Sequence, residues 1–206
     1  MNTQQIKSNL IEAYNKNATE RDAYIIENWK LELRTYFLSL IKEENKSSFL
    51  EIGAGAGKDS LFFQENGLSV KCIDLSPELV KICQQKGLAA QVMDMAQLSF
   101  PEESFDVVYT LNSLLHIPKK ELPIVLKNIQ MVLKPNGLFH LGVYGSENES
   151  EHIWEQDSYT PKRFFAFYSD DHLKQITNQY FELVSFKKIT LKENAPHFQC
   201  LILRKH

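Results

Sequence analysis

Three glycines alternate with single residues directly after a short apolar run. The run covers residues 49–52, the glycines are Gly53, Gly55 and Gly57, and a helical pattern begins at Ser60. This order predicts a strand, a tight turn and a helix N-terminus. Glycine adopts backbone angles closed to other residues, and without a Cβ it lets a ligand lie directly on the main chain. We therefore expect a bound ligand at the end of this first strand.

The spacing of the glycines separates two classes of ligand. In the dinucleotide fingerprint G-x-G-x-x-G the third glycine packs a helix against a strand beside a pyrophosphate. Position 58 would hold that glycine, but this chain has Lys58 there, and its own pattern is E-x-G-x-G-x-G, opened by Glu51. A second apolar run, 69–73, ends in Asp74, an acid placed to accept hydrogen bonds from two ribose hydroxyls. The pattern therefore disfavours a nicotinamide dehydrogenase.

With these residues the chain resembles the class I S-adenosylmethionine-dependent methyltransferases. Their first motif is a glycine turn opened by Asp or Glu, and their second is an acid at the tip of the next strand. The resemblance covers about residues 45–206 and is specific to the cofactor, not to a substrate. It implies S-adenosyl-L-methionine as cofactor and S-adenosyl-L-homocysteine as product. The cofactor-binding residues that it implies are Glu51, Gly53, Ala54, Gly55, Gly57, Asp74, Leu75, Asp94, Met95, Leu111 and Arg21.

Three of these residues carry specific expectations. Gly55 should tolerate substitution least, because a Cβ there would project toward the methionine part of the cofactor. Glu51 should hold the α-amino group of the cofactor, or else its carboxylate only caps the amide groups of the turn. Asp94, which follows the predicted strand 89–93, should accept a hydrogen bond from the adenine amino group, or else it is only a turn residue at the strand end.

Methyl transfer from a sulfonium is an in-line displacement, so holding the nucleophile in place and excluding water supply most of the rate. His116, after the predicted strand 105–110, is the candidate catalytic base, because imidazole takes a proton near neutral pH. The alternative is that it only holds its loop in shape. Aromatic and charged residues form the set of candidate substrate contacts: Tyr14, Tyr144, Trp154, Tyr159 and Arg163.

The elements of the chain must bring these residues to one edge. Strands are predicted at 49–52, 69–73, 89–93, 105–110 and 138–143. They alternate with helical patterns, which favours parallel pairing with right-handed crossovers. The runs 181–189 and 197–204 are joined by the short link 191–196, which permits only antiparallel pairing. The resemblance completes this as an α/β fold, a three-layer doubly wound sheet of seven strands in the order 3-2-1-4-5-7-6 with the last strand antiparallel.

A single domain is expected from 206 residues with 43% hydrophobic content. It comprises a helical N-terminal segment, 1–45, with candidate lid residues between Tyr14 and Arg21, and a cofactor-binding half, 46–143. A substrate lid insertion, 144–168, and a final helix with an antiparallel hairpin, 169–206, complete it. In the first segment one buried helix face is predicted from Ile26, Trp29, Leu33, Tyr36, Phe37 and Leu40. In the insertion, a small separate core is predicted from Phe164, Phe165 and Phe167.

Composition and short motifs indicate which classes of substrate and partner are disfavoured. A net charge of −3 argues against a broad basic face for nucleic acid. After the fourth strand the chain has Leu111-Asn112-Ser113-Leu114, where enzymes that methylate amino groups of nucleic acids carry Asn/Asp-Pro-Pro-Tyr/Phe. There is also no Pro-Cys pair to attack a pyrimidine ring. No apolar run approaches about 18 residues and the first residues are polar, so we expect a cytoplasmic protein without a membrane partner.

Cys72, Cys83 and Cys200 are scattered without a C-x-x-C pattern, so we predict core thiols, with neither a disulfide framework nor a metal site. The leading interpretation is methyl transfer to a small molecule. An RNA (tRNA) methyltransferase and a non-catalytic S-adenosylmethionine-binding partner subunit are the alternatives.

Overall fold

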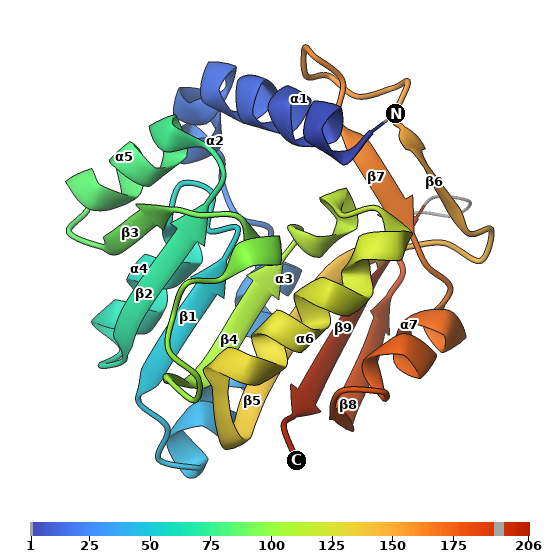
Figure 1. Ribbon diagram of the computed structural model, residues 1–206. Coiled ribbons are helices and arrows are strands. Elements are labelled where there is room, and N and C mark those ends of the chain that lie inside the picture. Colours follow the sequence, from blue (N-terminus) through green and yellow to red (C-terminus); the bar gives the residue numbers. More distant parts are fainter. Residues whose placement is uncertain (1, 192–195) are drawn as a thin grey trace.

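The structure is a computed structural model that describes residues 2–191 and 196–206 (Figure 1). Most of the predicted link 191–196 therefore lies outside the described residues. Seven strands form one sheet in the order β3-β2-β1-β4-β5-β9-β8. They are β1 Ser48–Ile52, β2 Ser69–Asp74, β3 Ala89–Val92, β4 Phe105–Leu111, β5 Leu133–Gly145, β8 Glu182–Ile189 and β9 His197–Arg204. This confirms the predicted order, because β8 and β9 are the sixth and seventh strands of the prediction.

Strand directions follow the prediction as well. The strands β3, β2, β1, β4 and β5 pair in parallel, whereas β9 runs antiparallel to both β5 and β8. All five parallel strands therefore end at the same edge of the sheet. Figure 1 shows helix α1, Thr3–Lys16, lying across that edge. The loops that follow the parallel strands and helix α1 thus lie together at the edge where a ligand is expected.

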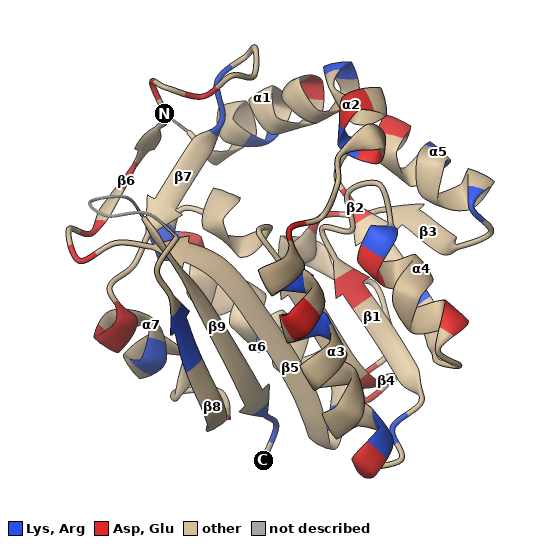
Figure 2. Cartoon of the chain, turned by 180° about the vertical axis from the view of Figure 1, so that it is seen from behind, with Lys and Arg blue, Asp and Glu red and all other residues tan. Residues whose placement is uncertain are grey.

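Helices cover both faces of the sheet, which explains why the central strands are apolar on both sides. On one face, Phe37 of α3 (Asn28–Glu43) and Phe63 of α4 (Lys58–Glu65) pack on Phe49 of β1. On the other, helices α6 (Leu122–Val132) and α7 (Asp170–Thr177) pack on the main core. Figures 1 and 2 show these two helical layers from opposite sides. Helix α5, Pro77–Gln85, follows β2 and begins at the N-cap Ser76.

The N-terminal segment is helical, but in three pieces: α1, α2 (Ala18–Ala23) and α3. The face of α3 that is buried consists of Leu33, Phe37, Leu38 and Ile41. Leu33 and Phe37 of the predicted face are therefore buried, whereas Tyr36, which was predicted together with Phe37 for one position of that face, is 54% exposed.

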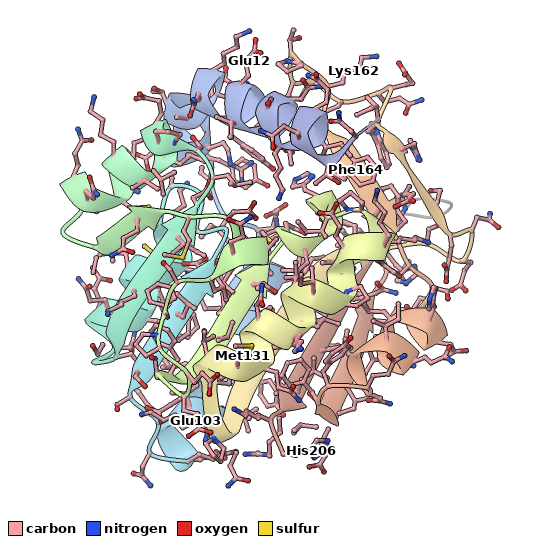
Figure 3. All side chains as sticks on the ribbon, in the orientation of Figure 1. Glu12, Glu103, Met131, Lys162, Phe164 and His206 are labelled. Atoms are coloured by element: carbon pink, nitrogen blue, oxygen red, sulfur yellow. The ribbon has the colours of Figure 1, made fainter. Side chains whose placement is uncertain are left out.

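The substrate lid insertion was predicted to begin at residue 144. The strand β5 continues to Gly145, so the first two residues of that range belong to the main sheet. The following β6–β7 arm, residues 146–167, contains β6 Ser150–Ile153 paired antiparallel with β7 Phe164–Phe167. Phe164 belongs to the main core cluster, so the prediction of a small separate core was wrong for this residue. Figure 3 shows Phe164 beneath α1, while Glu12 lies on the outer side of that helix.

Three short 3₁₀ helices connect the larger elements: η1 Met95–Gln97, η2 Leu114–His116 and η3 Lys119–Glu121. Both η1 and η2 follow the carboxyl ends of parallel strands, so their residues lie at the same edge of the sheet, where a ligand is expected. Among the described residues, no helix is long and apolar enough to cross a bilayer.

Candidate functional site

The glycine turn after β1 holds its shape through backbone bonds to β2. The amides of Gly53 and Ala54 donate to the carbonyl of Ile73 at 2.8 and 3.0 Å. Gly53, Gly55 and Gly57 all have positive φ, at 74°, 55° and 74°. Such angles are strained for residues with a Cβ, which explains three glycines in five positions.

The three glycines differ in what a side chain would meet. A Cβ on Gly53 would lie 2.3 Å from Cβ of Ser113, and one on Gly57 would lie 2.6 Å from a methyl of Leu88. A Cβ on Gly55 would meet only the guanidinium of Arg21, at 3.8 Å. Gly53 and Gly57 are therefore required by packing, whereas a Cβ at Gly55 would make only ordinary contact with Arg21. For folding, Gly53 and Gly57 are the more constrained glycines, and for ligand binding the special role of Gly55 stays a prediction.

A cavity of about 620 Å³, partly open to solvent, lies against this turn. The predicted cofactor residues that line it are Arg21, Gly53, Gly55, Asp74, Leu75, Met95 and Leu111. Glu51 and Ala54 line an adjoining recess that also includes Gly53 and Gly55. Gly57 and Asp94 line neither space. We call the cavity and its recess together the cofactor cavity.

Asp74 occupies the end of β2 between the glycine turn and the start of α5. Its two carboxylate oxygens accept from the amides of Gly55 and Ser76, each at 2.9 Å. Burial raises the pKa of Asp74, while these amide bonds oppose the shift. Since each oxygen retains a lone pair after one such bond, the group can still accept from two hydroxyls of a ligand. The geometry fits the predicted role toward a ribose.

Glu51 is buried at the end of β1 and accepts a hydrogen bond from the hydroxyl of Ser60. Burial, and then the negative charge of Asp59, raise its pKa well above the usual range. Arg34 pairs with Asp59 at 2.8 Å, and no described residue forms an ion pair with Glu51. A buried carboxylate without a cation is costly. The site therefore fits a ligand that brings its own ammonium group to Glu51.

Asp94 has other partners in this structure. One oxygen caps η1 by accepting from the amide of Ala96 at 2.9 Å, and the other pairs with Lys7 of α1 at 2.5 Å. Met93 and Met95, on either side of it, line the cofactor cavity instead. The arrangement matches the alternative in which Asp94 is a turn residue at the strand end.

Arg21 and Asn112 stand where the cofactor cavity meets its neighbour. Nε of Arg21 and Oδ1 of Asn112 are buried without a hydrogen-bond partner among the described residues. Asn112 directly follows β4 and has a φ of +56°, a conformation in which Asn is favoured over most residues. Asn112 was not predicted as a site residue, because in the sequence it stands out only as a departure from a nucleic-acid motif. Its position after the fourth predicted strand was the available signal.

A second cavity, of about 890 Å³ including space open to solvent, adjoins the first. The two share Tyr14, Arg21, Asn112 and His116. We call this second cavity the acceptor cavity, because the predicted substrate residues Tyr14, Tyr144, Tyr159 and Arg163 all line it. Trp154 does not, because it lines a groove on the far side of Arg163. The structure thus divides the predicted substrate residues between two places.

His116 is buried and has both ring nitrogens engaged. Nδ1 lies 2.7 Å from the carbonyl oxygen of Phe164, and Nε2 lies 2.6 Å from the hydroxyl of Tyr14. A carbonyl only accepts, so Nδ1 carries the proton and Nε2 accepts from Tyr14. Burial lowers the pKa of His116 to about 3, which keeps the ring neutral. The imidazole therefore reaches a ligand only through Tyr14.

Tyr14 connects α1 to the β6–β7 arm. Its oxygen accepts from Nη1 of Arg163 at 2.9 Å, and Arg163 in turn donates to both oxygens of Asp157 at 2.8 Å. Burial raises the pKa of Tyr14, although both nearby arginines act in the opposite direction. The phenol stays protonated and can donate to His116. This chain of contacts fixes the wall between the two cavities.

Three potential metal ligands approach one another elsewhere, at Glu147, Asp170 and His197. The ammonium of Lys188 lies among them, 2.6 Å from Glu147 and 3.1 Å from Asp170. These acids are therefore paired with a cation of the chain itself.

Comparison with known proteins identifies relatives. Residues 50–141 match the family described as "Methyltransferase domain". "Probable tRNA methyltransferase 9B" of Homo sapiens is 30% identical over 123 residues, covering 59% of this chain and 27% of that protein. "Thiol S-methyltransferase TMT1B" of Rattus norvegicus is 26% identical over 203 residues, covering 91% and 80%. "Phosphoethanolamine N-methyltransferase" of Plasmodium falciparum (isolate 3D7) is 21% identical over 182 residues, covering 85% and 67%.

Two solved structures share the fold. The Burkholderia thailandensis 1,6-didemethyltoxoflavin-N1-methyltransferase, with bound 1,6-didemethyltoxoflavin and S-adenosylhomocysteine, has a TM-score of 0.79 at 20% identity, covering 100% of this chain and 91% of that one. N-methyltransferase NodS from Bradyrhizobium japonicum WM9, in complex with S-adenosyl-l-homocysteine, has a TM-score of 0.69 at 15% identity, covering 94% and 98%. The chain spans less than half the length of several curated relatives, 27% of the human protein among them.

Proposed function

We propose that this chain, a member of the class I S-adenosylmethionine-dependent methyltransferases, transfers the methyl group of that cofactor to a small molecule. The observation that carries the proposal is the wall shared by the two cavities, formed by Tyr14, Arg21, Asn112 and His116. A ligand in the cofactor cavity and an acceptor in the adjoining one meet across this wall beneath α1. Such an enclosed meeting place suits a small acceptor that is buried as it reacts.

The cofactor cavity offers a group for each part of S-adenosyl-L-methionine. Glu51 holds the α-ammonium group, Asp74 holds the ribose hydroxyls, and the apolar side chains of Met93 and Met95 border the adenine. Arg21, which has no carboxylate partner among the described residues, suits the carboxylate of the methionine part. When bound, the cofactor supplies a methyl group on a positive sulfur, already activated for displacement.

The side chains of the acceptor cavity position the nucleophile and exclude water. The low pKa of His116 makes its imidazole a weak base, so its role here is to hold the hydroxyl of Tyr14 in one orientation. Arg163 fixes the same oxygen from the other side. Tyr14 is then a rigid hydrogen-bonding wall for the acceptor, and proximity supplies most of the rate. An amine acceptor releases its proton to solvent before it binds.

An RNA acceptor is less favoured. Two relatives, from Homo sapiens and Bos taurus, are named "Probable tRNA methyltransferase 9B", yet the match covers only 27% of the length of each. Figure 2 shows acidic and basic residues interspersed over helices α1 to α5, without the continuous basic stripe that binds a phosphate backbone.

A non-catalytic role as a cofactor-binding partner subunit has one observation in its favour. Ile25 is 86% exposed and Tyr24 is 52% exposed, next to each other between α2 and α3. Two exposed apolar residues near the mouth of the acceptor cavity provide a contact point for another chain.

The deciding experiment is incubation of the purified protein with a cell-extract metabolite pool and, separately, total RNA, each with S-adenosyl-L-methionine labelled in the methyl group. Mass spectrometry of the label is expected to find it in a small molecule and not in RNA. The Gly55→Val variant, which places a side chain where the ligand would lie on the glycine turn, serves as the control without transfer. Label in RNA alone would favour the tRNA function. Cofactor binding without any transfer would favour the partner-subunit role.

A further inference from the structure

We infer that the acceptor carries a planar aromatic ring system, which binds in a groove beside the acceptor cavity. This aromatic groove is lined by Tyr144, Trp154, Asp157, Arg163, Phe165 and Phe167. The inference rests on the proposed function, because it assigns the substrate class of the same site. It is carried by the continuity of the two spaces and by the chemistry of the groove wall.

The groove and the acceptor cavity share part of their lining. Tyr144, Arg163 and Phe165 line both spaces. The acceptor cavity in turn meets the cofactor cavity at Asn112 and His116. A molecule with its reacting group at this junction can therefore extend past Arg163 into the groove. The empty space of the groove, about 900 Å³ including the part open to solvent, leaves room for more than one ring.

Ring geometry in the groove suits an aromatic guest. The centroids of Trp154 and Phe167 lie 5.0 Å apart at 55°, and those of Trp154 and Phe165 lie 5.5 Å apart at 61°. Phe165 and Phe167 are nearly parallel, at 9°. Phe167 is buried and supports Trp154 and Phe165, which are only partly buried and are the two rings that an aromatic guest can contact by face or by edge.

Charge in the groove is balanced by the chain itself. The guanidinium of Arg163 donates to both oxygens of Asp157, whose side chain is only 4% exposed. The same guanidinium lies 3.8 Å from the ring centroid of Tyr159 and 5.2 Å from that of Phe165. Arg163 is therefore neutralised by Asp157 and covered by aromatic rings of the chain, so the groove offers no free cation to an acidic group and favours an uncharged aromatic guest.

Calorimetry on the intact protein saturated with S-adenosyl-L-homocysteine tests the inference. The probes are phenol, 2-naphthol and decahydro-2-naphthol, which share a hydroxyl group and differ in ring number and planarity. We expect 2-naphthol to bind about tenfold more tightly than either of the others, because its second ring stacks in the groove. Equal affinity for phenol and 2-naphthol would overturn the inference. Equal affinity for 2-naphthol and its saturated analogue would show that the groove takes any apolar group, which also overturns it.

Three variants locate the effect. Trp154→Ala should remove the preference for 2-naphthol, and Trp154→Phe should restore part of it. Trp29→Phe is the matched control, because Trp29 packs on Phe198 at 4.7 Å and does not line the groove. All three should keep their affinity for S-adenosyl-L-homocysteine, which verifies that they are folded. A preference that survives Trp154→Ala would place the ring elsewhere and overturn the inference.

The proposed function fails in a different way. If the ring preference depends on Trp154 but no labelled methyl group appears on any small molecule, the groove stands as a binding site and methyl transfer does not. If label appears on a small molecule without a planar ring, methyl transfer stands and the groove assignment falls.

Discussion

In the cofactor cavity, strand ends and one glycine turn within residues 51–113 supply most of the polar groups that face a ligand, and Tyr14, Arg21 and His116 of the shared wall supply others. In the acceptor cavity they come from α1 and from the β6–β7 arm, and the contact between Tyr14 and Arg163 joins residues 149 positions apart. Backbone bonds to β2 hold the first region, whereas side-chain bonds hold the second. The cofactor side is thus determined by a short stretch of sequence, and the acceptor side depends on long-range packing.

The strongest test of the comparison is Gly55→Val. The structure leaves room at Gly55 for a side chain, so the variant should fold, at a cost of about 1–3 kcal/mol for the strained φ of +55°, and bind S-adenosyl-L-homocysteine at least a hundredfold more weakly, about 2.7 kcal/mol. Calorimetry and thermal unfolding measure the two properties. Gly53→Val is the matched control, since it adds a clash with Ser113 to the same kind of strain and should lose a further amount of stability, about 3 kcal/mol. Normal binding by Gly55→Val would mean that no ligand lies on the turn.

A second test compares two acids at neighbouring strand ends. Asp74→Ala should weaken S-adenosyl-L-homocysteine binding by about ten- to a hundredfold, roughly 1.5–3 kcal/mol, through the loss of charge-assisted hydrogen bonds. Asp94→Ala should change it by less than about threefold, because Asp94 is occupied by Lys7 and Ala96. Calorimetry on both proteins checks this. If Asp94→Ala weakens binding as much as Asp74→Ala does, Asp94 contacts the cofactor as the sequence first predicted.

The two regions should also respond to pH with opposite signs. His116 has a pKa lowered to about 3, so below about pH 6.5 the unfolded state binds a proton that the folded state does not. Its contribution to stability is therefore lost as the pH falls from about 6.5 toward 3, by about 1.4 kcal/mol per pH unit. Glu51 has a raised pKa, so its contribution is present below its unfolded pKa and is lost as the pH rises.

Urea unfolding of the wild type, His116→Gln and Glu51→Gln from pH 4 to pH 8 measures both responses. The stability of the wild type relative to His116→Gln should decrease on acidification, and its stability relative to Glu51→Gln should increase. Parallel pH profiles for the three proteins would contradict the burial of these groups in the folded state.

The smallest expected effect belongs to Tyr14→Phe. This variant keeps the ring but removes the oxygen that joins Arg163 to His116. Turnover of an identified acceptor should fall about fivefold, roughly 1 kcal/mol, with cofactor affinity within about twofold. Steady-state kinetics and calorimetry separate the two. A loss confined to cofactor affinity would assign Tyr14 to the cofactor side of the wall.

The difference between the two regions also explains which features of the fold and the site could be predicted from the sequence. The glycine turn and the placement of Asp74 follow from local patterns of apolar residues, glycines and acids, whereas the strand order was implied by the family resemblance that these patterns carry. The partner of Asp94 is 87 positions away, and that of His116 on α1 is 102 positions away, so neither could be read from nearby residues. Likewise, Trp154 and Tyr159 lie only five positions apart in the chain but line different spaces, a separation that the path of the β6–β7 arm sets and that their spacing does not indicate.

The side-chain contacts that hold helix α1 in place affect the kinetics of ligand exchange. Lys7 joins α1 to η1, Asn15 accepts from Ser76 at the start of α5, and Tyr14 joins the helix to the β6–β7 arm. Because α1 lies across the edge at which the ligands are expected to bind (Figure 1), breaking these contacts would widen the part of the cofactor cavity that is already open to solvent. If chemically different ligands approach one common limiting rate of association at high concentration, detachment of α1 is the step that limits their entry.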